Sequence, residues 1–294
     1  MIHLFFRSIG FGKLKENAEL YRIVDDVVRH PDEQYVDKDS FGNDFACFSK
    51  YSGSDMGISV CGSFTSDDRF RIECYYPFFR GSQLSTREPV DLERHAAGEV
   101  FYGICDELKI GIPLIFFVNN VGDVFRESRF DEEPVAEGGA MLSGLAYRGK
   151  ILFPIAHSEE TAAIRQKSSE KRMNLMQQAR DGDKTAMENL TLSDMDLYAS
   201  ISRRVAKEDI LSIVESSIIP YGVESDQYTV IGEIVNVFSV RNRLSEEQVW
   251  VLTLLCNDME LDVCINANDL LGEPEVGRRF KGRIWMQGYV NFHF

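Results

Sequence analysis

The chain has 294 residues, 44% of them hydrophobic and 27% charged, and this ordinary composition excludes collagen-like, low-complexity and disordered proteins. A chain of this length is expected to form about two domains. Its 32 basic and 47 acidic residues give a net charge of −15, which argues against a general binder of nucleic acid or of anionic membranes.

The sequence predicts neither an export signal nor a membrane-spanning helix. The apolar run Ile2–Phe6 is too short for a signal segment. The longest apolar stretch, residues 110–118, contains Gly111 and Pro113, and a spanning helix needs about 20 apolar residues. We therefore expect a cytoplasmic protein.

The cysteine pattern agrees with that location. No two of the six cysteines form a Cys-x-x-Cys pair, and the predicted hairpin around residues 257–258 places Cys256 and Cys264 on opposite faces. We expect all six thiols to be reduced, as is usual in the cytoplasm.

Helix and strand patterns mix in the first half of the chain. Apolar residues between Leu20 and Val28 recur at helical spacing, and Pro31 ends this helix. A second helix is predicted from Leu92, Ala96, Val100, Ile104 and Leu108. Strands are predicted at 45–51, 57–64, 70–79, 112–119 and 144–155. The ordering predicts an α+β class, with an N-terminal mixed domain over residues 1–157.

Residues 158–220 are predicted to form a helical connector. Ser158, Asp183 and Ser193 are N-cap candidates. The first stretch, 158–180, is polar almost all round, which favours an exposed segment over a partner-binding helix.

Residues 221–294 predict a small β-barrel. Strands are expected at 228–241, 249–256 and 259–265, then a short helix-like insert at 266–271. Residues 279–285, a turn at Gln287-Gly288 and a closing strand at 289–294 complete the pattern. This order is similar to an OB barrel, and an SH3-like barrel is the alternative.

Several segments resemble one uncharacterised protein family of clostridial anaerobes, over nearly the whole chain. They are FFRSIGFGKLKENAEL near the start, YYPFFRGS, ERHAAGEVFYGICDELKIGIPLIFF, ARDGDKTAMENLTLSDMD, YGVESDQYTVIGEI and DVCINANDLLGEPEVGRRFKGRIWMQGYV. The resemblance implies a cytoplasmic bacterial protein and transfers no catalytic residue.

One set of residues has catalytic side-chain types. Asp91, His95, Glu99 and Tyr102 fall near one line on the predicted second helix, where a carboxylate would orient an imidazole as a general base. A solvated polar stripe explains the same spacing and is favoured.

The familiar motifs of catalysis and cofactor binding are missing. There is no Gly-x-Ser-x-Gly, no Gly-x-Gly-x-x-Gly and no Walker loop, and the five histidines are scattered. We therefore assign no catalytic residue and expect no cofactor and no metal.

The predicted barrel carries a strip of basic and aromatic residues. Its members are Arg278, Arg279, Lys281, Arg283, Trp285 and Tyr289. Cations beside a stackable ring suit single-stranded nucleic acid. However, residues 225–294 hold 6 basic and 10 acidic residues, so binding driven by counterion release would be weak. A protein or interdomain surface is the favoured interpretation.

The run Tyr75-Tyr76-Pro77-Phe78-Phe79-Arg80 is a further surface to explain. Core packing is the favoured account, and a partner or small-molecule pocket is the alternative.

The sequence as a whole favours a non-catalytic binding or adaptor protein that uses its barrel for protein interaction. Weak binding of single-stranded nucleic acid is the first alternative, and an enzyme that uses the His95 helix is the second.

Overall fold

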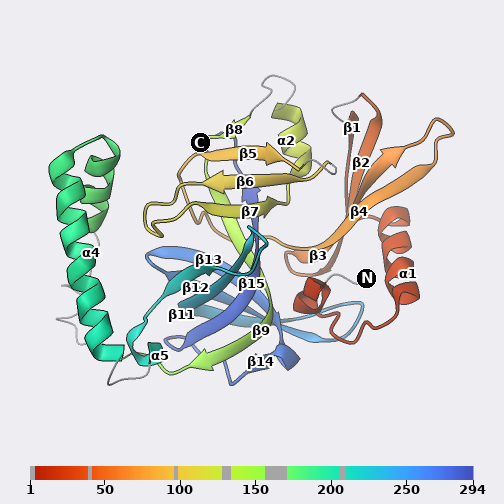
Figure 1. Cartoon of the computed structure of the whole chain (residues 1–294). Helices are drawn as coiled ribbons and strands as arrows, with labels where there is room; N and C mark the ends of the chain where they lie inside the picture. The colour runs from red at the N-terminus through yellow and green to blue at the C-terminus, as the bar shows by residue number, and fades with distance from the viewer. Residues whose placement is uncertain are drawn as a thin grey trace.

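The computed structural model describes residues 4–38, 42–95, 99–127, 134–155, 171–205 and 210–293. It mixes helices with two sheets and confirms the α+β class (Figure 1). Residues 171–180 are helical. The other helices are η1 (Leu4–Ile9), α1 (Asn17–Arg29), α2 (Val121–Glu127), α4 (Lys184–Val205), α5 (Ile210–Ile213) and η2 (Ala267–Asp269).

A four-stranded antiparallel meander forms the first sheet. Its strands are β1 (Glu33–Lys38), β2 (Asp44–Gly53), β3 (Met56–Phe64) and β4 (Phe70–Phe79). The predicted first helix is confirmed as α1, which packs its apolar side, with Leu20, Val24 and Val27, against β2 and β3. The three strands predicted between residues 45 and 79 are confirmed as well.

An eleven-stranded sheet contains the rest. Its strands are β5 (Val90–Arg94), β6 (Phe101–Cys105), β7 (Leu114–Val118), β8 (Val135–Ala136), β9 (Ala140–Leu152), β10 (Ser217–Pro220), β11 (Gln227–Arg241), β12 (Gln248–Cys256), β13 (Met259–Asn266), β14 (Leu270–Leu271) and β15 (Arg279–Val290).

The predicted second helix is wrong: its residues form the antiparallel hairpin β5–β6, in which Leu92 pairs with Gly103 and Asp91 with Ile104. The apolar residues recur every four positions, a spacing that fits one face of a helix and also one face of a strand, because four is a multiple of two. The β-branched and aromatic residues of 100–104 favour the strand. Ala96 lies outside the described residues.

Five strands close into a barrel in the order β11, β12, β13, β9, β15 and back to β11. The β13–β9 pairing is parallel and the other four are antiparallel. As predicted, a short helix, η2, lies between the third and fourth strands, and the arrangement is OB-like. The barrel takes β9 from outside residues 221–294.

The predicted turn at Gln287-Gly288 is wrong, since both residues lie inside the continuous strand β15. A Cβ atom at Gly288 would lie 2.4 Å from the Phe116 ring. The glycine therefore permits close packing rather than a turn. The strand expected at 289–294 is replaced by β9, which pairs with β15 along its length.

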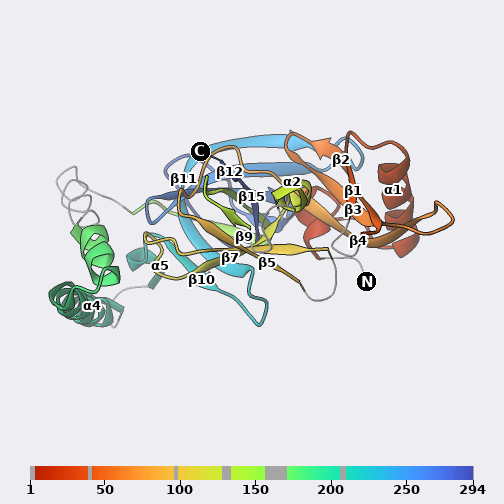
Figure 2. The ribbon, with the colours of Figure 1, turned by 90° about the horizontal axis from the view of Figure 1, so that it is seen from above.

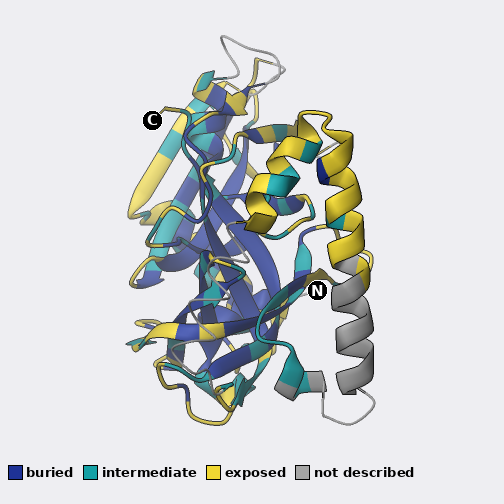
Figure 3. Cartoon of the chain, turned by 90° about the vertical axis from the view of Figure 1, so that its left-hand side faces the viewer, coloured by how far each residue is buried: buried dark blue, intermediate teal, exposed yellow. Residues whose placement is uncertain are grey.

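The helix α4 lies beside the sheets, at the left of Figure 1, and stands apart from them when seen from above in Figure 2. Its N-terminal part is mostly exposed (Figure 3). The N-cap expected at Asp183 is confirmed, because its Oδ1 accepts from the amides of Thr185 (2.8 Å) and Ala186 (3.3 Å). Ser193 lies inside the helix, so that N-cap is wrong, and Ser158 lies outside the described residues.

The expectation of six reduced thiols is wrong for one pair: Cys47 and Cys61 form a disulfide. The two residues face each other across β2 and β3. Cys74, Cys105, Cys256 and Cys264 are free, so the prediction that Cys256 and Cys264 do not bond is confirmed. No helix among the described residues is long and apolar enough to cross a membrane.

Candidate functional site

The basic and aromatic strip of β15 does not form one open surface. Arg279 is buried, and its guanidinium donates to the carbonyls of Phe153, Val214 and Leu211 at 3.0, 2.6 and 2.8 Å. Arg278 pairs with Glu275 at 3.0 Å. These two guanidinium groups are therefore engaged within the chain.

The remaining members of the strip have different surroundings. Arg283 lies over the Tyr221 ring, 4.0 Å from its centroid, and Lys281 is half-buried. Trp285 is only 5% exposed. Alternation along the strand would place Trp285 on the same outward face as Arg283. However, Phe5 of η1 and Phe117 of β7 contact the Trp285 ring and cover it.

The four residues assigned to a helical stripe are also separated. Asp91 is exposed on β5, whereas His95, Glu99 and Tyr102 line one cavity that does not include it. Trp285 lines the same cavity from the barrel side. Three of the four residues assigned to the stripe and Trp285 of the barrel strip, predicted as parts of separate sites, thus meet at one place.

This aromatic–acidic cavity has a volume of about 410 Å³ and lies between β4, the β5–β6 hairpin and the barrel strands β11 and β15. Its phenylalanine, tyrosine and tryptophan rings belong to Phe5, Phe45, Tyr75, Tyr76, Tyr102, Phe117 and Trp285. Its carboxylates belong to Glu73, Glu99, Glu224 and Asp226. No lysine or arginine is among its described lining residues.

The rings of the cavity support one another. Phe117 lies 5.1 Å from Trp285 and 4.6 Å from Tyr76, measured between ring centroids. The Phe5 ring also lies near Trp285, at 5.6 Å between centroids. Rings held in this way offer fixed faces, whose negative quadrupoles attract cations.

Two of the four carboxylates already have cationic partners. Glu99 pairs with Arg94 at 2.5 Å, and Glu73 lies 3.5 Å from Arg71 and also accepts a hydrogen bond from Ser63. Asp226 has no ion pair within the described chain. Its Oδ2 accepts a hydrogen bond of 2.6 Å from the indole Nε1 of Trp285.

Asp226 is the most buried carboxyl group of the cavity without an ion pair in the described chain. It is only 7% exposed, and burial raises the pKa of its carboxyl, against the lowering effect of the Trp285 hydrogen bond. Burial also raises the pKa of Tyr102, and the negative charges of Asp226 and Glu224 raise it further. The field inside the cavity is therefore negative.

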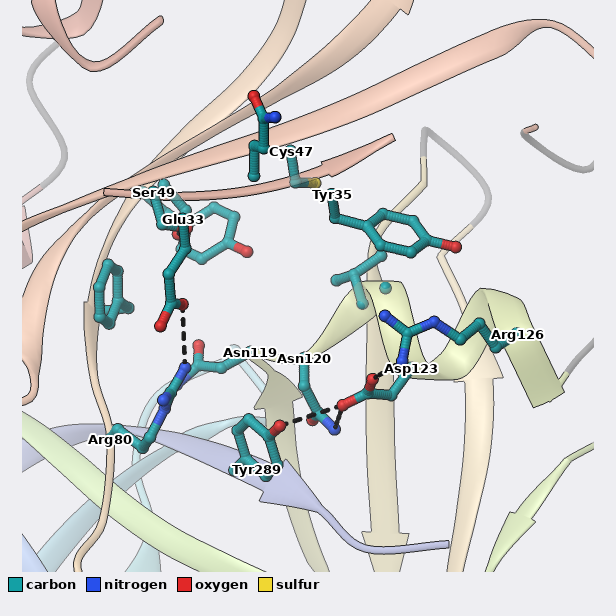
Figure 4. A pocket seen from close by; sticks show the side chains of 16 residues that line it. Glu33, Tyr35, Cys47, Ser49, Arg80, Asn119, Asn120, Asp123, Arg126 and Tyr289 are labelled. Carbon is teal, nitrogen blue, oxygen red and sulfur yellow. Dashed lines mark hydrogen bonds and ion pairs between the residues drawn. The ribbon is translucent and has the colours of Figure 1, made fainter. Parts of the chain in front are cut away.

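A second, polar pocket of about 170 Å³ lies between the four-stranded sheet, α2 and the end of β15 (Figure 4). Asp123 joins its wall together: it pairs with Arg126 at 2.9 Å and accepts from Asn120 at 3.0 Å and Tyr289 at 3.1 Å. On the opposite side, Arg80 lies 3.4 Å from Glu33. Tyr289, predicted for the barrel strip, belongs to this pocket.

The aromatic run at residues 75–80 lines both the aromatic–acidic cavity and the polar pocket. Tyr75 and Tyr76 line the aromatic–acidic cavity, while Tyr76, Phe78 and Arg80 line the polar pocket. The favoured account of this run, core packing, is confirmed for Tyr76, Phe78 and Phe79, which are buried in the core. Sequence reasoning missed Asp226 and Glu224, which precede β11 with no motif around them.

Neither the aromatic–acidic cavity nor the polar pocket has the ligands of a recognisable metal centre among its described residues. Within the described residues, no group of three or more His, Cys, Asp or Glu side chains is arranged to hold a metal ion. The site is thus defined by rings and carboxylates in a closed α+β fold with an OB-like barrel.

The chain belongs to the DUF3881 family, described as "Domain of unknown function, E. rectale Gene description", whose model matches residues 6–288. The resemblance to an uncharacterised family is therefore confirmed. No curated protein and no solved structure matches the chain.

Proposed function

We propose that this chain is a non-catalytic binding protein whose aromatic–acidic cavity receives an organic cation, an ammonium or guanidinium group. The observation that supports the proposal is Asp226: a carboxylate with 7% exposure and no cationic partner within the described chain, in a cavity walled by aromatic rings. A buried carboxylate is normally paired or protonated.

A cation would satisfy both kinds of wall at once. It would neutralise Asp226 and Glu224, and its alkyl part would pack on Trp285 and Tyr102. An anion would meet an uncompensated negative field. The cation can belong to a free amine or to a lysine or arginine side chain of a partner protein, and the second source is the adaptor role expected from the sequence.

Fluorescence of Trp285 measures this binding directly. The chain holds two tryptophans, so Trp250→Phe leaves Trp285, which bonds to Asp226, as the only indole. We would titrate this variant with n-butylammonium, n-butylguanidinium, 1-butanol and butyrate. The two cations are expected to change the emission at saturable concentrations, and the neutral and anionic analogues are not.

Asp226→Asn tests the carboxylate itself. Asparagine still accepts from the indole, so the cavity keeps its shape, while cation affinity is expected to fall at least about tenfold because the charge partner is lost. Glu233→Gln is the matched control: it removes an exposed carboxylate of neighbouring β11 and should leave affinity unchanged. Equal affinities in Asp226→Asn and the parent, or equal binding of 1-butanol, would contradict the proposal.

A separate arm distinguishes the two sources of the cation. A capped peptide, acetyl-Gly-Lys-Gly-amide, presents the same ammonium on a backbone. Binding of the peptide more tightly than n-butylammonium favours a protein partner. Binding of the free amine alone favours a small-molecule ligand.

The two alternatives from the sequence stay predictions. For nucleic acid, the burial of Arg279 and Trp285 leaves a smaller basic face than the strip contained. For an enzyme, His95 lines the cavity, but it is exposed and follows the end of β5 rather than lying on a helix.

A cytoplasmic location remains part of the proposal. The Cys47–Cys61 disulfide weighs against it, because disulfides persist mainly in oxidising compartments. Alkylation of thiols in intact cells before lysis would decide the redox state of this pair.

A further inference from the structure

The polar pocket contains one sulfur of the disulfide. Cys47 is half-buried and lines the pocket, and its sulfur is drawn there in Figure 4. Cys61 is only 1% exposed and is not among the lining residues. Because thiol–disulfide exchange requires access to the attacked sulfur, a reagent in this pocket reaches Cys47 and not Cys61.

The charged groups around Cys47 come in balanced pairs. Glu33 and Arg80 lie 3.4 Å apart, with side chains 52% and 35% exposed. Glu33 also accepts a hydrogen bond of 2.9 Å from Tyr51, and Arg80 lies 4.9 Å from the centroid of the Tyr289 ring. Arg126 is 61% exposed beyond its contact with Asp123. Such exposed pairs contribute little to stability, so their charges are open to exchange with those of a ligand. A molecule with one amino and one carboxylate group matches this lining.

We propose that the polar pocket is a thiol–disulfide exchange site at Cys47 for a zwitterionic aminothiol, a small thiol that carries both an amino and a carboxylate group. Glu33 takes the ammonium, and Arg80 or Arg126 takes the carboxylate. This site is independent of cation binding in the aromatic–acidic cavity.

The exchange step balances without an oxidant. The thiolate of the ligand attacks Cys47 Sγ, the Cys47–Cys61 bond breaks, and a ligand–Cys47 disulfide forms. The electron pair leaves on Cys61 Sγ, which takes up one proton, and the ligand thiol has lost one. The reverse attack by Cys61 restores the original bond.

Cys74 lies next to this pair but does not compete in the resting state. It stands opposite Cys61 across β3 and β4, so three cysteines follow one line across the sheet. Burial raises the pKa of the Cys74 thiol to about 11, which keeps it protonated and a poor nucleophile at neutral pH. Cys61 is therefore the expected partner in the reverse step.

The test uses three thiols of similar size: L-cysteine, cysteamine and 3-mercaptopropionate. Each is incubated with the oxidised wild-type chain, quenched in acid, and alkylated with N-ethylmaleimide in denaturant before peptide mass spectrometry. We expect the adduct on Cys47 and the maleimide on Cys61. Each opening rate is divided by the rate of the same thiol with a small uncharged disulfide, because thiolate nucleophilicity varies with thiol pKa. This ratio should be about fivefold higher for L-cysteine than for the other two thiols.

Charge variants test the recognition. Glu33→Gln and Arg80→Gln are each expected to reduce the preference for L-cysteine towards unity. Arg241→Gln, which removes an exposed arginine paired with Glu246 on the barrel, should leave it unchanged. Rates that follow thiolate concentration alone, or an adduct on Cys61, would overturn the proposal.

A second measurement does not depend on opening the disulfide. Cys61→Ala leaves Cys47 as a thiol in the pocket, and the symmetrical disulfides cystine, cystamine and dithiodipropionate then compete for it. The cysteine adduct should dominate at equilibrium. Equal adducts from all three reagents, or six free thiols in the untreated wild-type chain where the structure has four, would overturn the proposal.

Discussion

Asp226 couples the stability of the fold to pH. Burial raises the pKa of its carboxyl in the folded chain, so between the ordinary and the raised value the folded state binds more protons than the unfolded state. In that window stability falls as pH rises, because the proton lost from Asp226 leaves a buried charge. Asparagine carries no such charge and keeps the bond to Trp285.

We therefore expect Asp226→Asn to gain stability relative to wild type as pH increases from the acid range to neutrality. Urea unfolding at a series of pH values measures the difference in unfolding free energy. A saturating organic cation should stabilise wild type at neutral pH and remove the difference. A difference that shrinks with rising pH would mean that the carboxylate is paired with a cation inside the chain.

The sequence contains a signal for the Cys47–Cys61 disulfide but none for the burial of Asp226. The strands predicted at 45–51 and 57–64 join through a short turn, which sets 51 opposite 57 and hence Cys47 opposite Cys61, so the disulfide had a signal. Asp226 had none. Its burial follows from Trp285, about sixty residues later in the chain, and such a long-range contact leaves no local pattern.

At the scale of elements, the correct predictions were those with a distinctive period. The α1 residues between Leu20 and Val28 recur at three and four, which only a helix brings to one face. The β5–β6 residues recur at four alone, which suits either structure. The candidate residues His95, Glu99 and Tyr102 were thus grouped for the wrong reason, although all three line the cavity.

Gly288 tests how tightly β15 packs on β7. A Cβ atom there would lie 2.4 and 2.5 Å from two atoms of the Phe116 ring, which is fully buried. Gly288→Ala should lower the unfolding free energy by about 1–3 kcal/mol through overpacking, measured by urea denaturation. Phe116→Leu in the same chain removes the ring, so the double variant should lose less than the sum of the two single losses. Additive losses would contradict the packing argument.

At the scale of the molecule, β9 and β15 join the two halves. Residues 140–152 close the barrel between β13 and β15, and β15 pairs with β7 of the first half at Gln287 and Gly288. No sequence pattern assigns a strand to a distant partner. The predicted ranges 1–157 and 221–294 therefore gave no indication that β9 pairs with barrel strands or that β15 pairs with β7. The aromatic–acidic cavity depends on it, because its rings come from both halves.

The shared strands predict one cooperative unit. If β9 left the barrel, β13 and β15 would each lose a neighbour, and their buried core residues, such as Val263 and Ile284, would be exposed. Native-state hydrogen exchange should therefore give the most protected amides of β3, β7, β9, β12 and β15 one common opening free energy, equal to that of global unfolding. Trp285 fluorescence and the strand circular dichroism should change together in urea. Higher protection in β11–β13 than in β2–β4, with two separate transitions, would instead show that residues 1–157 and 221–294 unfold as independent domains.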